Sequence, residues 1–371
     1  MYELQKQEVT IDQPPNMRLS RIFYTIKPFI PRQVQIFLRR RIIAYQRKKY
    51  RHIWPIDPDA GNPPKGWPGW PDNKKFALII SHDVDTQEGH DRCDRLMEIE
   101  ERLGVRSSFN IVPEKYRVSP HLIDDLKNRG FEVCAHGLNH DGKLFFSRSI
   151  FDERATRINH YLQKWGSVGF TSPSMHHKLS WMHALNITHS TSTFDTDPFE
   201  PQPDAVGTIF PFWVQNTSQT LRPSENVQFC SRSKKENILT GDIQKVFRGL
   251  KYDSDEEIEQ KGTFCEGLKK GYVELPYTLP QDLTLFVLMK ERTIHIWKNK
   301  LDWIAQKGGM VLFNSHPDYM NFNNPKNGPE QYPVTYYTEF IEYIKNRYKD
   351  QYWHVLPKEM ARFWQQNVRQ D

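Results

Sequence analysis

Cysteine is scarce in this sequence, with four residues in 371: Cys93, Cys134, Cys230 and Cys265. None belongs to a Cys-x-x-Cys pair, so the spacing argues against a disulfide framework and against a zinc site made of cysteines. Scattered, unpaired cysteines are typical of proteins that fold in a reducing compartment. The scarcity therefore predicts a cytoplasmic location.

Long apolar runs are also missing. The first 30 residues contain acids and prolines but no apolar core of the length that a secretory signal requires. No run approaches the length of apolar sequence that a membrane-spanning helix needs. We therefore expect a chain that starts inside the cell and does not cross a membrane as a helix.

Acidic residues are absent from positions 17–56, which carry eleven lysines and arginines. The formal net charge of the whole chain is +6, so the positive charge resides in this segment and the remainder is slightly acidic. Apolar residues recur at three- and four-residue spacing within 33–51, which predicts a basic amphipathic helix. The apolar positions of this helix are Val34, Phe37, Leu38, Ile42 and Tyr45.

A basic amphipathic helix fits two different surroundings. Its apolar face can lie in a membrane interface while its cations contact anionic headgroups. Alternatively, the helix packs on the main domain and keeps a solvated basic face. The lack of acids favours an anionic membrane surface as partner of residues 17–56. No recognised nucleic-acid module accompanies the basic segment, so a nucleic-acid partner is not expected.

Residues 52–75 contain six prolines, three glycines and three tryptophans. Proline at this density excludes a helix and favours an extended connection. We expect a basic extension at 1–51, a linker at 52–75 and a catalytic domain at 76–371. The tryptophans indicate that the linker docks on a surface.

Strand-like and helix-like segments alternate from residue 76 onward. Short apolar strands, each followed by a helix, predict a parallel sheet covered by helices, most simply closed as a (β/α) barrel. Polar residues at 216–270 interrupt this rhythm and indicate an insertion. The expected strands are 76–81, 107–112, 131–135, 167–171, 187–192, 272–276, 309–314 and 352–355. The expected helices are about 88–103, 119–129, 150–164, 291–306, 335–348 and 357–367.

Four polar clusters fall where predicted strands end. Their sequences are SHDVDT at 81–86, HGLNHD at 136–141, TSPSMHH at 171–177 and NSHPDY at 314–319. Catalytic groups of a (β/α) barrel lie at the carboxyl ends of its strands. We therefore expect the four clusters to converge on one rim of the barrel.

His136 and His140 are four residues apart, a spacing that can place two imidazoles on one ion. By itself this pair is a weak signal. The two aspartates of SHDVDT strengthen it, because a carboxylate from another strand end would complete a set of two histidines and one carboxylate. Such a set leaves coordination positions open for water and substrate, as in a catalytic metal site.

The stretches FALIISHDVDT, HGLNHDGK, GFTSPSMHH, STFDTDPFEPQ and VLFNSHPDYM together resemble the polysaccharide deacetylase family. This is carbohydrate esterase family 4, with its NodB homology domain. The resemblance covers about 76–320, with the motifs in the family's order and spacing. It implies a distorted (β/α)₇ barrel and metal-dependent hydrolysis of acetyl groups on sugars.

The resemblance implies that Asp85, His136 and His140 are the ligands of a divalent metal ion, and we expect Zn²⁺. It makes Asp83 the catalytic base. A zinc-class ion polarises an acyl carbonyl and lowers the pKa of bound water, and a carboxylate that is not a ligand accepts the water's proton. Positions 83 and 85 share a face of an extended strand, so we expect the strand to end or bulge there.

The resemblance also makes His316 the general acid and places Pro173 and Ser174 at the substrate, where a backbone amide helps to hold the oxyanion. A histidine opposite the base is needed because an amide does not expel a bare amide anion; the departing amine must be protonated.

Two positions depart from the family's pattern. The third motif usually begins with an arginine that orients the base, and this chain has Thr171. The fourth motif usually carries an aspartate, where this chain offers Ser190, with Asp195 or Asp197 as possible substitutes. Two supporting charges of the family's site are therefore missing at the expected positions.

The sequence is interpreted as a cytoplasmic bacterial deacetylase that is metal-dependent and acts on an N-acylated sugar. The basic helix suggests a lipid-linked glycan precursor at the inner face of the plasma membrane, as in surface-polysaccharide assembly. One rival is a catalytically inactive carbohydrate-binding relative, suggested by Thr171 and Ser190. The other is a glycosyltransferase whose DxD motif holds a nucleotide-sugar. The second is disfavoured because the motif follows the first strand directly.

Overall fold

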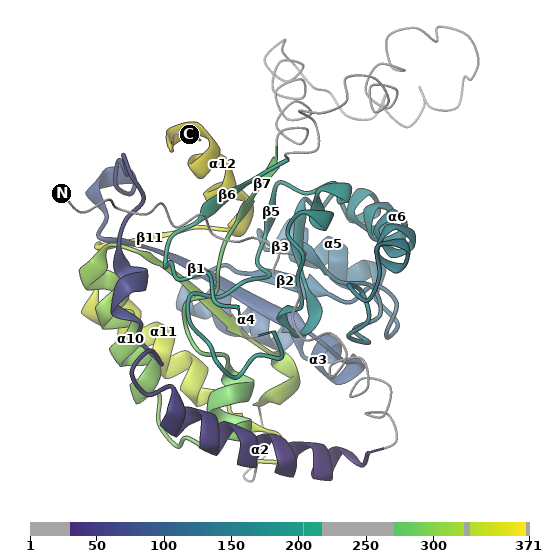
Figure 1. The fold of residues 1–371 in the computed structure, drawn as a ribbon, viewed down its shortest axis with the longest axis horizontal. Coiled ribbons are helices and arrows are strands. Elements are labelled where there is room, and N and C mark those ends of the chain that lie inside the picture. Colours follow the sequence, from purple (N-terminus) through teal and green to yellow (C-terminus); the bar gives the residue numbers. More distant parts are fainter. Residues whose placement is uncertain (1–29, 203, 217–270, 323–326, 369–371) are drawn as a thin grey trace, which may run out of the picture.

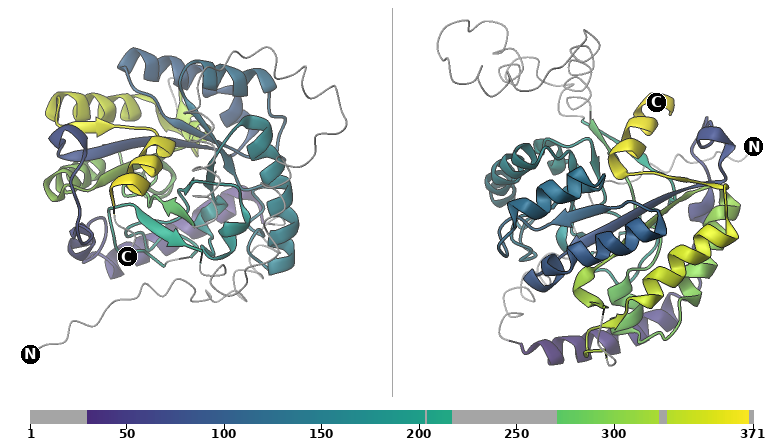
Figure 2. Two further views of the ribbon diagram at one scale, coloured as in Figure 1. Left: turned by 90° about the horizontal axis from the view of Figure 1, so that it is seen from above. Right: turned by 180° about the vertical axis from the view of Figure 1, so that it is seen from behind.

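The structure, a computed structural model, describes residues 30–202, 204–216, 271–322 and 327–368. Its centre is a curled nine-stranded sheet with helices around the strands (Figures 1 and 2). The strands of this sheet are β1 (Phe76–Val84), β2 (Ser108–Ile111), β3 (Glu132–His136), β4 (Gly169–Thr171), β5 (His189–Ser190), β6 (Phe212–Gln215), β7 (Gly271–Glu274), β8 (Met310–Ser315) and β11 (Tyr352–His354).

Seven parallel strands form the barrel, in the order β8-β1-β2-β3-β4-β5-β7. The ring closes just after β7, where the N–H groups of Thr278 and Leu279 donate to the carbonyl of Leu312 in β8. β11 adds a further parallel strand beside β1, and β6 pairs antiparallel with β7. The expected (β/α)₇ barrel is confirmed.

Most of the described helices occupy the connections between strands. Their boundaries follow local signals, as in α6, where the hydroxyl of Ser147 accepts the Ile150 N–H and Gly166 ends the helix in the left-handed conformation. The described helices are α2 (Arg32–Lys49), α3 (Gln87–Asp91), α4 (Cys93–Leu103), α5 (Pro120–Asn128), α6 (Arg148–Trp165), α10 (His295–Lys307), α11 (Thr335–Arg347) and α12 (Pro357–Asn367).

The central strand β1 explains why the sequence shows no apolar–polar alternation there. All nine of its residues are buried, because helices cover one face and the barrel interior covers the other. β1 runs three residues beyond the expected end at 81 and stops at Val84, between the two aspartates. In a continuous strand, positions 83 and 85 would lie on the same face. The end of β1 at Val84, between them, releases the two aspartates from this constraint.

Several short elements were not predicted. These are β6, the small sheet of β9 (Met320–Asn321) and β10 (Tyr332–Pro333), a π-helix η8 (Leu283–Leu288), and single 3₁₀ turns such as η4 (Pro173–Met175) and η9 (Pro317–Tyr319). Each is too short for a periodic pattern to develop in the sequence. The predicted insertion at 216–270 lies outside the described residues, apart from Asn216.

The basic helix α2 lies across one edge of the molecule (Figure 1). It packs on η8 through Ile36 and Ile43, which are buried. The stripe predicted to be its apolar face points the other way and is 45–70% exposed. Neither expected surrounding describes the helix completely, because it docks on the domain and still presents apolar side chains outward. The exposed stripe is Val34, Phe37, Leu38, Ile42 and Tyr45.

The tryptophans of the proline-rich segment dock on the barrel. Trp54 and Trp70 are buried, and the indole N–H of Trp70 donates to the carbonyl of Gly308 at 2.8 Å. Trp67 stacks on Trp364 of α12. The segment is therefore fixed along its length. Among the described residues, no helix is long and apolar enough to cross a membrane.

Candidate active site

The side chain of Asp83 lies at the end of β1 and is held by two amides. Asn110, its partner across the β1–β2 pairing, donates from Nδ2 to Asp83 Oδ1 at 2.7 Å. Asn314 at the end of β8 donates from Nδ2 to Asp83 Oδ2 at 2.9 Å. Asp83 is 3% exposed, so these amides replace the water that a carboxylate would otherwise bind.

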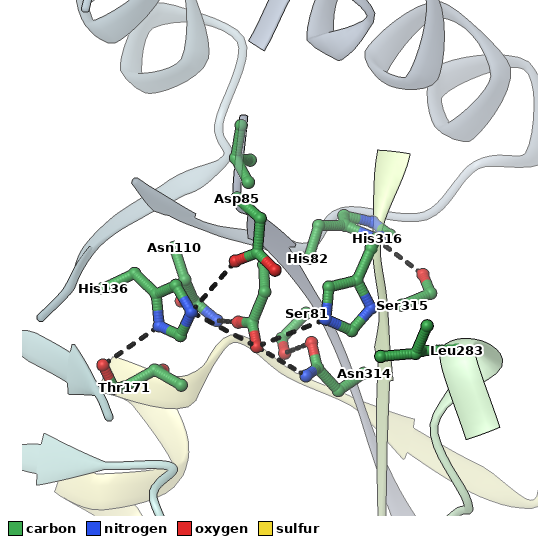
Figure 3. A network of polar contacts seen from close by, with 12 residues as sticks. Ser81, His82, Asp85, Asn110, His136, Thr171, Leu283, Asn314, Ser315 and His316 are labelled. Atoms are coloured by element: carbon green, nitrogen blue, oxygen red, sulfur yellow. Dashed lines mark hydrogen bonds and ion pairs between the residues drawn. The ribbon is translucent and has the colours of Figure 1, made fainter. Parts of the chain in front are cut away.

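Asp85 and the two histidines of the predicted ligand set converge on one point. Asp85 Oδ1 lies 3.3 Å from Nε2 of His136 and 3.0 Å from Nε2 of His140. Nδ1 of His136 lies 3.1 Å from the carbonyl oxygen of Thr171, which fixes the proton on Nδ1 and leaves a lone pair on Nε2. Figure 3 shows His136 and His316 on opposite sides of Asp85.

This arrangement suits a metal ion. Asp85 Oδ1 is buried and takes part in no hydrogen bond, although two imidazole nitrogens face it. Burial lowers the pKa of His140, which favours the neutral form that ligates metals. Burial opposes the charge on Asp85, but its contacts with His140 and His136 hold the pKa of Asp85 well below its usual range. The donor set is the one that zinc takes in catalytic sites.

His316 lies across from this trio and is held by Asp282. Nδ1 of His316 is 2.6 Å from Asp282 Oδ1, and the His316 N–H donates to Oδ2 at 2.8 Å. Asp282 is fully buried and also accepts from the Tyr332 hydroxyl and the Leu283 N–H, which begins η8. Burial alone would lower the pKa of His316, but Asp282 raises it to about 10.

Asp83 lies between the trio and His316. Its Oδ2 is 3.8 Å from Nε2 of His136 and 3.8 Å from Nε2 of His316. This oxygen, which also accepts the hydrogen bond from Asn314, therefore faces both the candidate metal position and the opposite imidazole. With this arrangement, Asp83 can take a proton on one side of a reacting centre while His316 donates a proton on the other side.

Pro173 and Ser174 form the turn η4 after β4. Ser174 and Met175 have φ values of 56° and 52°, so this turn is held in the left-handed region. Pro173 packs on Gly137, where a Cβ atom would lie 2.5 Å from Pro173 Cγ. A small depression is lined by His140, Pro173 and other residues of the 138–145 and 172–176 segments. The turn therefore lies beside His140 of the trio.

Asp318 is a supporting residue that the sequence did not single out. Its Oδ2 accepts the Asp85 N–H at 3.1 Å and its Oδ1 accepts the Thr86 hydroxyl at 2.5 Å. Gly89 allows this approach, because a Cβ there would lie 2.3 Å from Oδ2. Burial raises the pKa of Asp318 to about 6. Asp318 fixes the chain direction immediately after β1.

At the two positions that depart from the family pattern, uncharged side chains make hydrogen bonds in place of the expected charges. Thr171 hydrogen-bonds through its hydroxyl to Thr191, and amides rather than a guanidinium hold Asp83. Ser190 donates to Ser192 at 2.8 Å. Asp195 pairs with Lys300, and Asp197 accepts from Tyr277.

His316 is held by Asp282 and by neither of the two aspartates considered from the sequence, Asp195 and Asp197. Asp282 follows the predicted strand 272–276 by six residues. Its position after PYTLPQ, close to a strand end, was the available signal. Asn314 lay inside a recognised cluster, whereas Asn110 stood in a predicted strand with nothing to mark it.

Comparisons with known proteins bear on the fold. No family model and no curated protein matches the sequence. Among solved structures, a putative polysaccharide deacetylase from Mycobacterium smegmatis is similar over 80% of this chain and 93% of its own, at 15% identity and a TM-score of 0.52. A probable polysaccharide deacetylase from Pseudomonas aeruginosa is similar over 85% and 99%, at 16% identity and a TM-score of 0.52.

An allantoinase is similar to the same degree, over 85% of this chain and 98% of its own, at 15% identity and a TM-score of 0.53. At identities this low, the structural similarity establishes a shared fold and nothing more. Together with the seven-stranded barrel and its rim of polar clusters, they show that this chain has the fold of the polysaccharide deacetylases.

Proposed function

We propose that this protein is a metal-dependent hydrolase that removes an N-acyl group, in the simplest case acetyl, from a sugar. One observation carries the proposal. The trio of Asp85, His136 and His140 faces the non-ligand carboxylate of Asp83, and His316 lies opposite. The same fold occurs in an allantoinase, so the site rather than the fold supports this assignment.

In the proposed reaction Asp85, His136 and His140 hold a divalent ion, most simply Zn²⁺. When bound there, the ion polarises the acyl carbonyl and lowers the pKa of water. Asp83 accepts the proton of the attacking water, and the amides of Asn110 and Asn314 keep its oxygens aimed at that water.

His316 supplies the proton that the departing amine requires. Asp282 keeps the imidazole charged and fixes its orientation through contacts to Nδ1 and to the backbone N–H. The free Nε2 is then the proton donor, directed toward Asp83. A backbone amide at the turn of Pro173 and Ser174 would complete the site by donating to the oxygen that becomes negative.

We also propose that the protein attaches to an anionic membrane surface through α2. The outward stripe of Val34, Phe37, Leu38, Ile42 and Tyr45 is exposed, and Arg41, Lys48 and Lys49 on the same helix are exposed as well. A helix with apolar side chains flanked by cations binds anionic lipid in its interfacial plane.

A groove beside α2 supports a lipid-linked glycan as substrate. It is lined on one side by Arg40, Arg47, Lys48 and Arg51, and by Trp54. Cations around a groove at a membrane-facing helix suit the phosphate of a lipid carrier. In this proposal the enzyme works at the inner face of a bacterial plasma membrane, on a precursor of a surface polysaccharide.

Acetate release from a panel of lipid-linked and free N-acetyl sugars tests the function. The full chain is assayed after chelation, with Zn²⁺ added back, beside Asp83→Asn as the inactive control. We expect turnover of at least one N-acetyl sugar that disappears on chelation and returns with metal. Metal-loaded protein that binds sugars but releases no acetate would instead make it a carbohydrate-binding relative.

A further inference from the structure

A second cluster of metal-ligating side chains lies inside the barrel, away from the candidate active site. It consists of Glu132 and Cys134 of β3 and His189 of β5, all buried and at most 4% exposed. Glu132, Cys134 and His136 alternate along β3 and so share its inward face. The active-site residue His136 ends the strand, whereas Glu132 begins it, so the second cluster occupies the other end of the barrel interior.

The three side chains meet above a glycine. Gly169 of β4 lies between the two strands; it pairs with His189, and the next residue along β4 pairs with Ala135. A Cβ on Gly169 would lie 2.4 Å from Nε2 of His189 and 2.5 Å from Sγ of Cys134. The glycine therefore leaves the space in which an imidazole and a thiol from flanking strands come together.

The distances within the cluster are those of ligands around a common ion. Nε2 of His189 is 3.4 Å from Oε1 of Glu132, and Sγ of Cys134 is 3.8 Å from both atoms. Tetrahedral zinc with its usual bond lengths places nitrogen and oxygen ligands about 3.4 Å apart and sulfur about 3.6 Å from either. The separations are long for direct hydrogen bonds between nitrogen and oxygen, which lie near 2.9 Å.

Charge and supporting contacts agree with a bound cation. A carboxylate, a thiolate and a neutral imidazole together balance a divalent ion, which avoids leaving net charge in a buried site. The second oxygen of Glu132, Oε2, accepts the N–H of Lys358 at 3.0 Å, in the first turn of α12.

We propose that Glu132, Cys134 and His189 form a second metal site, which holds a zinc-class divalent ion and ties β3, β5 and the start of α12 together. Binding releases the thiol proton of Cys134 and the carboxyl proton of Glu132 to solvent, and no redox step is involved. The three side chains leave the fourth coordination position to a water molecule, and the existence of the site does not depend on whether the rim of the barrel hydrolyses acylated sugars.

Cobalt distinguishes the two sites, because only the second contains sulfur. Since the cluster is buried, the full chain is produced in medium supplied with Co²⁺, so that the ion enters during folding. We expect the near-ultraviolet charge-transfer absorption of a cobalt–thiolate bond, at one equivalent per chain. The double variant His136→Ala/His140→Ala removes the rim site and should retain the band.

Cysteine variants assign the band. Cys134→Ser should lose the band because it removes the thiolate. His189→Gln should also lose the band because it removes the imidazole ligand. Cys93→Ser and the double variant Cys230→Ser/Cys265→Ser should keep it. Cobalt-loaded wild-type protein without the band, or a band that survives Cys134→Ser, would overturn the proposal.

A second measurement covers the case in which Cys134→Ser does not fold. X-ray absorption at the zinc edge of wild-type protein produced with Zn²⁺ reports the ligand atoms directly. A sulfur scatterer in the His136→Ala/His140→Ala variant is expected. A zinc shell of nitrogen and oxygen alone, or no bound zinc in that variant, would show that the cluster is only a buried hydrogen-bonded group.

Discussion

Nδ1 of His316 lies 2.6 Å from Oδ1 of the fully buried Asp282, on the π-helix side of the site. The contact joins an imidazole at the end of β8 to the residue that precedes η8, 34 positions earlier in the chain. It raises the pKa of His316 to about 10, against the effect of burial. His316 is therefore held as a cation at neutral pH, ready to donate a proton.

Asp282→Asn should move the alkaline limit of activity to lower pH. His316 works in its protonated form, so activity is lost as the pH rises through the pKa of His316. An amide at 282 keeps the hydrogen bond but removes the negative charge that raises this pKa. The pH dependence of kcat/KM measures the shift. An unchanged alkaline limb would show that another group sets it.

Asp83→Asn should abolish turnover and leave the metal content unchanged. The side chain is held by two amides and is not one of the trio, so its charge is needed for proton transfer rather than for binding an ion. A loss of about 10²–10⁴-fold is expected for a general base.

Metal analysis beside the kinetics separates the two aspartates. The matched variant Asp85→Asn should lose one equivalent of metal together with activity. Loss of metal from Asp83→Asn, with retention in Asp85→Asn, would mean that the two residues have exchanged roles.

Phe37→Glu/Ile42→Glu should weaken binding to anionic vesicles. The change places two carboxylates in the exposed stripe of α2, and about 1 kcal/mol for each charge near the surface corresponds to roughly 30-fold in total. The control His160→Glu/Gln366→Glu adds two carboxylates on exposed positions of α6 and α12.

Co-sedimentation with vesicles that contain anionic lipid measures the effect. Wild-type protein and the control should both bind and be released at high salt, since screening weakens exposed charge interactions. Equal binding by the stripe variant and the control would rule out α2 as the attachment surface.

Lys300→Met should destabilise the barrel by about 3–5 kcal/mol, because it leaves the carboxylate of Asp195 buried without a partner. The two side chains are at most 1% exposed, and Lys300 Nζ is 2.7 Å from Asp195 Oδ2. Denaturant unfolding measures the change in the free energy of unfolding. The double variant Asp195→Leu/Lys300→Met should recover much of the loss, and a double variant as unstable as the single one would contradict this account.

The barrel and the convergence of its polar clusters could be predicted because both follow from local patterns. Apolar runs such as 76–80 define strands, and parallel strands bring their carboxyl ends to one rim. Asp85, His136 and His140 belonged to such ends. Asp282 lies six residues past the end of a predicted strand, and it is positioned by a short π-helix that leaves no periodic signal in the sequence.

The orientation of α2 was also beyond the sequence. Ile36 and Ile43 lie seven residues apart on one side, and the longer stripe of five apolar residues lies on the other. Periodicity favours the larger stripe as the buried face. The surface of η8 accommodates the two isoleucines, and its Val287 carbonyl accepts from Arg40, so the smaller side is the one that docks.

The docking of α2 on η8 has a mechanical consequence. Arg40 of α2 donates to the carbonyl of Val287 near the end of η8, and the residue that caps the start of η8 is Asp282. A force that a lipid surface exerts on α2 is therefore transmitted to His316 through Arg40, the backbone of residues 283–287 and Asp282. The segment that would hold the protein at a membrane therefore also supports His316, the proposed proton donor, and a chain that begins at Trp54 would lose both contributions together.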